Sequence, residues 1–157
     1  MNADENTLNN QLKYINKEFI FNLDNEVFIK NSLGVIEASL NSNNDDLFNE
    51  ARLTALVFLH HPLVADFYFR NFKVLDPFSL ISMISAFERF KYKKAIPLLL
   101  SLIKERPYYM IRIAICAIGN LCDESHIPEL QRIMASVEDM KVMDGIQGAI
   151  EKIRTEK

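Results

Sequence analysis

The feature that most constrains this chain is an apolar pattern that recurs four times at an almost constant interval. In each copy an alanine is followed directly by a large apolar residue and, three positions later, by another. The copies are Ala55-Leu56-x-x-Leu59, Ala86-Phe87-x-x-Phe90, Ala117-Ile118-x-x-Leu121 and Ala149-Ile150-x-x-Ile153, at intervals of 31, 31 and 32 residues. A period of this size is typical of stacked supersecondary units. The pattern therefore predicts a repeat architecture.

The spacing of apolar residues predicts helices along the whole chain, because large apolar residues recur at steps of three and four. Proline stands near the expected helix starts at 62, 97 and 128, where its missing N–H does no harm. No stretch alternates between polar and apolar residues as a strand would. We expect an all-α fold of about nine helices, at about 7–22, 27–40, 46–60, 62–73, 77–91, 95–105, 108–121, 127–136 and 139–154.

The first two expected helices lack the repeated pattern. Their apolar stripes have helical spacing and consist of Leu8, Leu12, Ile15, Phe19 and Leu23, then Val27, Phe28, Leu33, Ile36 and Leu40. A stack of repeats needs a cover over its first apolar face. We therefore expect a single domain over 1–157, with an N-terminal helical cap at 1–44 and repeats at 45–157.

Composition limits the classes of protein to which this chain could belong. Of 157 residues, 49% are hydrophobic, which is ample for a core, yet no apolar run is long enough to span a membrane. The polar, acidic N-terminus is unlike a signal peptide. These observations predict a cytoplasmic protein without membrane contact. The apolar surroundings of Cys116 and Cys122 favour inert core residues over reactive or bridged ones.

The net charge of −3 conceals an uneven distribution of charged residues. Residues 1–50 carry a net charge of −6, residues 51–113 carry +6 and residues 114–157 carry −3. A basic middle segment could steer an acidic partner towards the chain. The same charges could instead belong to ordinary solvated helix faces, and both interpretations remain open from the sequence.

The stretch from Ile111 to Asp123, with the following Ile127-Pro128-Glu129-Leu130, resembles a short HEAT-like repeat of the phycobilisome-lyase type. The residues that carry the resemblance are Arg112, Ala114, Ala117, Gly119, Asp123 and Pro128, and it is best over 77–155. It implies a right-handed α-solenoid of antiparallel helix hairpins that serves as a scaffold for protein binding. It also implies that Arg112 pairs with an aspartate near a turn, such as Asp123, or with an acidic residue of the neighbouring hairpin. A role for Arg112 in partner binding is the alternative.

Five residues are candidates for partner binding: Arg89, Tyr92, Tyr108, Tyr109 and Arg112. Two adjacent tyrosines at a helix start cannot both face a core, and tyrosine and arginine are enriched at binding hot spots. The run at 89–94 interleaves basic and aromatic residues. Such a run could also contact a nucleic acid, although the overall charge of −3 disfavours this.

The sequence contains no motif for catalysis, for a metal or for a phosphate loop, so we expect no enzyme activity and no cofactor. The functional hypothesis is a scaffold that binds another protein, one with an acidic surface, along one face of the solenoid. A bacterial adaptor or a toxin-immunity protein would suit the size and architecture. Two alternatives stay open: a lyase-like enzyme or pigment chaperone with a small molecule in the concave face, and nucleic-acid binding through 89–94.

Overall fold

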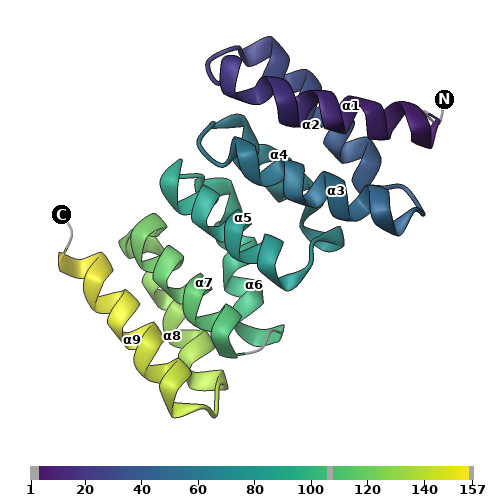
Figure 1. Cartoon of the computed structure of the whole chain (residues 1–157). Helices are drawn as coiled ribbons and strands as arrows, with labels where there is room; N and C mark the ends of the chain where they lie inside the picture. The colour runs from purple at the N-terminus through teal and green to yellow at the C-terminus, as the bar shows by residue number, and fades with distance from the viewer. Residues whose placement is uncertain (1–3, 106–107, 156–157) are drawn as a thin grey trace. The chain divides into compact units, whose positions relative to one another are not determined.

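The computed structural model describes residues 4–105 and 108–155, and within these ranges the chain consists of nine α-helices, short 3₁₀ turns and loops, without a strand (Figure 1). The side chains of Glu105 and Tyr108 also lie outside the description. The all-α prediction and the number of helices are confirmed for the described residues. The chain divides into two compact units, Met1–Ala86 and Phe87–Lys157, and the division falls within one helix.

The first unit contains four helices and most of a fifth. They are α1 (Glu5–Glu18), α2 (Glu26–Leu40), α3 (Asp45–Ala55), α4 (Leu63–Asn71) and α5 (Pro77–Arg89). Helix α1 packs against α2 and α3, and α2 also contacts α4 (Figure 1). Asparagines begin two of these helices: the side chain of Asn25 accepts the backbone N–H of Phe28, and that of Asn44 accepts the N–H of Leu47.

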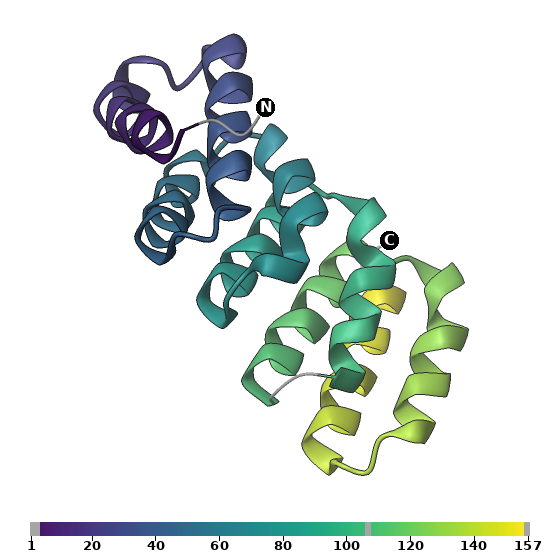
Figure 2. The same ribbon diagram turned by 90° about the vertical axis from the view of Figure 1, so that its right-hand side faces the viewer.

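The second unit contains the end of α5 and four complete helices. They are α6 (Ile96–Glu105), α7 (Tyr108–Leu121), α8 (Ile127–Ser136) and α9 (Met140–Thr155). Helix α7 packs against α6 and α9, and α8 packs against α9 (Figure 2). Aspartates at helix starts act as caps here, since Asp139 accepts the N–H of Lys141 at 2.8 Å and Asp123 caps a 3₁₀ turn.

The repeated alanines are buried in all four copies of the pattern, which agrees with the close packing that the sequence predicts. The first copy nevertheless differs from the expectation of one helix over 46–60. Helix α3 ends at Ala55, and a 3₁₀ turn follows at Leu56–Phe58. Because a 3₁₀ turn has three residues per turn instead of 3.6, it changes which side chains face inwards. Phe58 is buried there, whereas Leu59 is only half-buried.

Two positions that periodicity assigns to the core lie at the surface instead. Leu23 is 50% exposed and Val27 is 70% exposed. Helix α1 ends at Glu18 and continues as a 3₁₀ turn at Phe19–Phe21, so the stripe of α1 does not extend beyond Ile15 as a buried face. The same change of helical type that displaces Leu59 therefore accounts for Leu23, which follows the 3₁₀ turn. Nothing in the structure explains the exposure of Val27, which belongs to the regular helix α2.

The cysteines also depart from the expectation of two inert core residues. Cys116 is exposed on α7, and Cys122 is half-buried just after the helix. Burial and the nearby Asp123 carboxylate raise the pKa of the Cys122 thiol to about 12. Cys122 is therefore protonated at neutral pH and unreactive, as the sequence suggests, whereas Cys116 is accessible to solvent.

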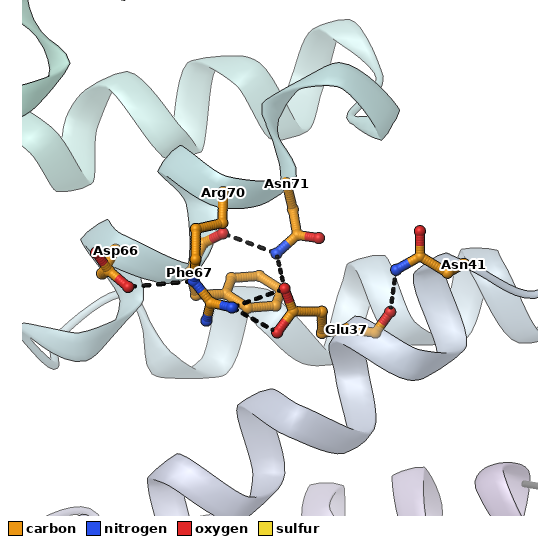
Figure 3. A network of polar contacts seen from close by, with 6 residues as sticks. All are labelled: Glu37, Asn41, Asp66, Phe67, Arg70 and Asn71. Carbon is orange, nitrogen blue, oxygen red and sulfur yellow. Dashed lines mark hydrogen bonds and ion pairs between the residues drawn. The ribbon is translucent and has the colours of Figure 1, made fainter. Parts of the chain in front are cut away.

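A polar cluster that the sequence analysis did not identify joins α2 to α4 (Figure 3). The Nη1 atom of Arg70 lies 2.8 and 2.9 Å from the two carboxylate oxygens of Glu37. Its Nε atom donates to Asp66 one turn earlier, at 3.2 Å. Asn71 adds a hydrogen bond to Glu37 at 3.1 Å. Because Arg70 is about half exposed, these contacts orient the two helices more than they stabilise them.

Asp76 connects the start of α5 to α3. Its Oδ1 atom accepts the backbone N–H groups of Phe78 and Ser79, at 2.9 and 3.3 Å. Its Oδ2 atom accepts the Ser79 hydroxyl at 2.6 Å and lies 2.9 Å from Nη1 of Arg52. Partial burial by itself would raise the pKa of this carboxyl, but the hydrogen bonds from Ser79 and Arg52 outweigh it and hold the pKa below its usual value.

The substitution Asp76→Asn should lower the free energy of unfolding by about 1–2 kcal/mol at neutral pH, because the neutral amide loses the ion pair with Arg52 although its oxygen can still cap α5. A carboxyl with a depressed pKa in the folded state stabilises the fold above its unfolded pKa, and this contribution disappears as the pH falls through the folded pKa. Urea unfolding of both proteins should therefore show a difference that shrinks below the ordinary aspartate pKa of 3.8. A difference that stays constant down to pH 2 would contradict this assignment.

The buried pattern in α7 can be tested with one truncation. Ile118 is fully buried, so Ile118→Ala should reduce the free energy of unfolding by about 2–5 kcal/mol. Met140 lies in the same unit and is 72% exposed. Met140→Ala should therefore change the free energy of unfolding by less than about 0.5 kcal/mol. Equal effects of the two substitutions in chemical denaturation would show that the pattern does not mark the core.

Candidate protein-binding groove

A groove of about 370 Å³ runs between α7 and α9 in the second unit. Helix α7 contributes Arg112, Cys116 and Gly119 at steps of four and three residues, so these side chains share one face of the helix. Helix α9 contributes a matching stripe at steps of four, three and four: Lys141, Gly145, Gly148 and Lys152. The groove therefore follows two helix faces that lie side by side. We call it the α7–α9 groove.

Small residues form the floor of the α7–α9 groove. A Cβ atom on Gly119 would lie 3.6 Å from the Cα of Ala149, so the two helices approach closely at this point. A Cβ atom on Gly145 would lie 3.3 Å from Cδ1 of Ile115, whereas one on Gly148 would meet nothing within 4 Å. Gly148 therefore leaves open space that helix packing does not require.

The rim of the α7–α9 groove is cationic. Arg112, Lys141 and Lys152 all line it, and its described lining contains no carboxylate. Arg112 and Lys141 are exposed, while Lys152 is half-buried. Three positive charges above an apolar floor produce a local potential that attracts negatively charged groups. The groove is thus suited to an acidic ligand segment.

A chain of polar contacts fixes one end of the α7–α9 groove. The side-chain amide of Asn120 donates to the carboxylate of Glu88, at the end of α5, and its oxygen accepts from the ammonium group of Lys152 on α9. The interval is 32 residues in each step, so the contacts connect equivalent regions of three helices that carry the repeated pattern. Asn120 therefore acts as a positioning residue for Lys152.

The expected pair of Arg112 and Asp123 does not form. Asp123 instead lies 3.5 Å from Nζ of Lys93 and 2.9 Å from Nδ1 of His126. Hydrogen bonds from Ser125 and His126 lower the pKa of the Asp123 carboxyl to about 2. In the described part of the structure Arg112 makes no hydrogen bond or ion pair, and its exposed side chain lies over the groove. The reason is geometric, because Arg112 lies three turns of α7 before Asp123.

The two tyrosine candidates stand at the start of α7. Tyr109 is 47% exposed and precedes Arg112 by three residues, so both lie on the same side of α7, although only Arg112 lines the groove. Tyr108 is the first residue of α7, and its side chain lies outside the described residues. Tyr109 thus stands one helical turn before Arg112 on α7, outside the lining of the groove.

The other two candidates, Arg89 and Tyr92, do not line the α7–α9 groove. Arg89 is exposed at the end of α5. The ring of Tyr92 stacks on Phe87, with 5.5 Å between the ring centroids, so it covers the core of the turn at 90–95. Within the same basic run, Lys91 donates to the carbonyl of Asn120 at 3.2 Å and Lys93 pairs with Asp123. These contacts hold the turn against the end of α7.

Of the residues that line the groove, sequence reasoning identified Arg112 but missed those on α9. Lys141 and Lys152 look like ordinary solvated charges in the sequence. The signal that could have revealed them is the pair Gly145 and Gly148, because two glycines within a helix cost stability that a packing or binding role must offset. Their spacing of three residues puts them on the same face as the two lysines.

The two glycines of α9 provide a matched pair of substitutions. Gly148→Ala should raise the free energy of unfolding by about 0.5–1 kcal/mol, because the new Cβ meets open space and alanine favours the helix. Gly145→Ala should raise the free energy of unfolding by less, because the new Cβ would lie in close contact with the side chain of Ile115. Thermal and urea unfolding would measure both, and a larger gain at position 145 would contradict the described geometry.

Comparison of the chain with known proteins assigns it to no family. No family model, no curated protein and no solved structure matches the chain. No helix in the described ranges has the length and apolar character that crossing a membrane requires.

Proposed function

We propose that this chain is a non-catalytic protein-binding module and that the α7–α9 groove holds an acidic segment of its partner. The observation that carries the proposal is the combination of three cations with a floor of small residues and with no carboxylate in the described lining. Lysine and arginine attract carboxylates over a distance, and arginine can also bind them in a bidentate manner. Each carboxylate of the partner would thus find a counter-charge in the groove.

The shape of the groove supports an extended or helical peptide rather than a small metabolite. A floor without long side chains lets a peptide backbone approach both helices. The exposed Tyr109, one turn before Arg112 on α7, would add an aromatic contact outside the lining. The apolar area between the cations would contribute affinity, and the cations would set specificity and the association rate.

The proposal includes the architecture that the resemblance implies, a right-handed HEAT-like solenoid built from antiparallel hairpins. Two observations support it: the four alanines of the 31–32-residue pattern are buried, and the contacts of Asn120 with Glu88 and Lys152 follow the same period. Repeat stacks of this kind commonly present extended binding surfaces.

We propose a cytoplasmic location. The free thiols of Cys116 and Cys122 support it, because disulfides are typical of proteins in oxidising compartments. A bacterial adaptor or a toxin-immunity protein would match a chain of this size. Its partner would then present an acidic surface.

The test uses random linear peptides displayed on phage and selected on the full chain. Enriched peptides should be rich in aspartate and glutamate. The double substitution Arg112→Glu with Lys141→Glu should weaken their binding at least about tenfold and flatten its dependence on salt, because two of the three rim cations are reversed. Both residues are exposed, so the melting temperature should stay nearly unchanged.

Lys94 provides the matched control for this experiment, since it is an exposed cation of the same unit that does not line the groove. Lys94→Glu should leave peptide binding unchanged. A loss of binding with Lys94→Glu, but not with the double variant, would move the site to the run at 89–94. Filter binding of single-stranded nucleic acid at two salt concentrations would then separate the two kinds of partner.

A further inference from the structure

Helices α7 and α9 run parallel along the α7–α9 groove and keep one register. A Cβ atom on Gly119 would lie 3.6 Å from the Cα of Ala149, and one on Gly145 would lie 3.3 Å from Cδ1 of Ile115. Each of these contacts joins residues that are 30 positions apart in the sequence. Because the offset is the same at both contacts, the two helices run in the same direction. The register thus fixes which residues face each other across the groove.

The two ends of the α7–α9 groove offer a ligand different contacts. At the 30-residue offset Arg112 lies level with the first turn of α9, so Arg112 and Lys141 line the same end. Lys152 lies over the other end. A Cβ atom on Gly119 would lie 3.5 Å from its Cδ atom, and its ammonium group donates to Asn120. The two exposed cations are therefore together at one end.

Gly148 lies between these two ends and leaves space beside it. It is exposed and lines the groove, and a Cβ atom built on it would meet nothing within 4 Å. It follows Lys141 by seven residues, which is two helical turns or about 10 Å along α9. Ile115 and Ala149 belong to the same lining. A large apolar side chain of a partner would fit here and would be removed from water.

Carboxylates of α9 border the groove without lining it. Asp139 caps the helix by accepting the N–H of Lys141 at 2.8 Å. Asp144 and Glu151 are exposed, and helical geometry puts them on the side of α9 opposite to the buried Ala149, which faces α7. These two acids would repel a ligand carboxylate at the outer edge of α9. A ligand carboxylate is therefore favoured on the side of α7.

Beyond Lys152 the charges have mixed signs. Asp123 lies there, 3.5 Å from Nζ of Lys93, and Lys91 donates to the carbonyl of Asn120 at 3.2 Å. Mixed charges give a ligand carboxylate little net attraction. The end with the two exposed cations is thus the place where the groove selects an acidic side chain.

We infer that the segment which the α7–α9 groove binds is an amphipathic helix. Its acidic residue would lie at the end with Arg112 and Lys141, and a large apolar residue seven positions away would lie over Gly148. Two helical turns span about 10 Å and return both side chains to one face. An extended segment spans 10 Å in about three residues, whose first and last side chains point to opposite sides. The inference rests on the proposed function, because it specifies the partner of the same groove.

The test uses linear peptides displayed on phage and selected on the full chain. Peptides that lose affinity for the variant Arg112→Glu with Lys141→Glu are called rim-dependent. Gly148→Leu fills the space in the groove. Gly34→Leu is the matched control, because a Cβ atom on Gly34 also meets nothing within 4 Å but lies on α2 of the first unit. Both glycines are exposed and helical, so neither substitution should lower the melting temperature.

We expect rim-dependent peptides to bind Gly148→Leu at least about tenfold more weakly and to bind Gly34→Leu as they bind the unmodified chain. They should carry a large apolar residue seven positions from an acidic one, and circular dichroism should show added helix on binding. Replacing the apolar residue of the peptide by alanine should weaken binding to the unmodified chain but have little effect on binding to Gly148→Leu. This coupling would show that the two side chains occupy the same space.

Two results would overturn the inference alone. One is full affinity of rim-dependent peptides for Gly148→Leu. The other is unchanged affinity after a proline is placed midway between the acidic and the apolar residue, because proline interrupts a helix. A selection that yields no rim-dependent peptide would instead contradict the proposed function, and the inference would fail with it.

Discussion

The close approach of α7 and α9 is the constraint on which the proposed binding surface depends. Only small residues at the crossing allow it, because a Cβ on Gly119 would already be in contact with Ala149. This approach places the exposed stripe of one helix beside that of the other. As a result, Arg112 from α7 and Lys141 from α9 border the same groove although they are far apart in the sequence. The chemistry of the groove thus follows from a packing requirement.

The repeated pattern predicted the buried positions well where the helices are regular. Ala117 and Ile118 are buried, as the spacing requires. The prediction was wrong where a 3₁₀ turn replaces the end of an α-helix, after Ala55 and after Glu18. A periodicity argument assumes 3.6 residues per turn, and nothing in the local sequence signals the change to three. The exposure of Leu23 could therefore not be foreseen from spacing alone.

The candidate site was predictable in part, and for a physical reason. Arg112 could be selected from the sequence because it is a charged residue in an apolar helix. Tyr109 could be selected because two adjacent tyrosines cannot both face the core. Lys141 and Lys152 lie on an amphipathic helix with many charges, where lysines are expected in solvent. Only the pairing of α7 with α9 brings them to Arg112, and pairing is a tertiary property. The contact of Asn120 with Lys152 likewise requires the assembled unit.

The positions of the three cations explain why the groove depends on more than one helix. Arg112 belongs to α7, whereas Lys141 and Lys152 belong to α9, and the side-chain oxygen of Asn120 accepts from the ammonium group of Lys152. The proposed preference for acidic segments therefore requires that the two helices stay packed against each other. A substitution that separates α7 from α9 would disperse these charges although it changes none of them.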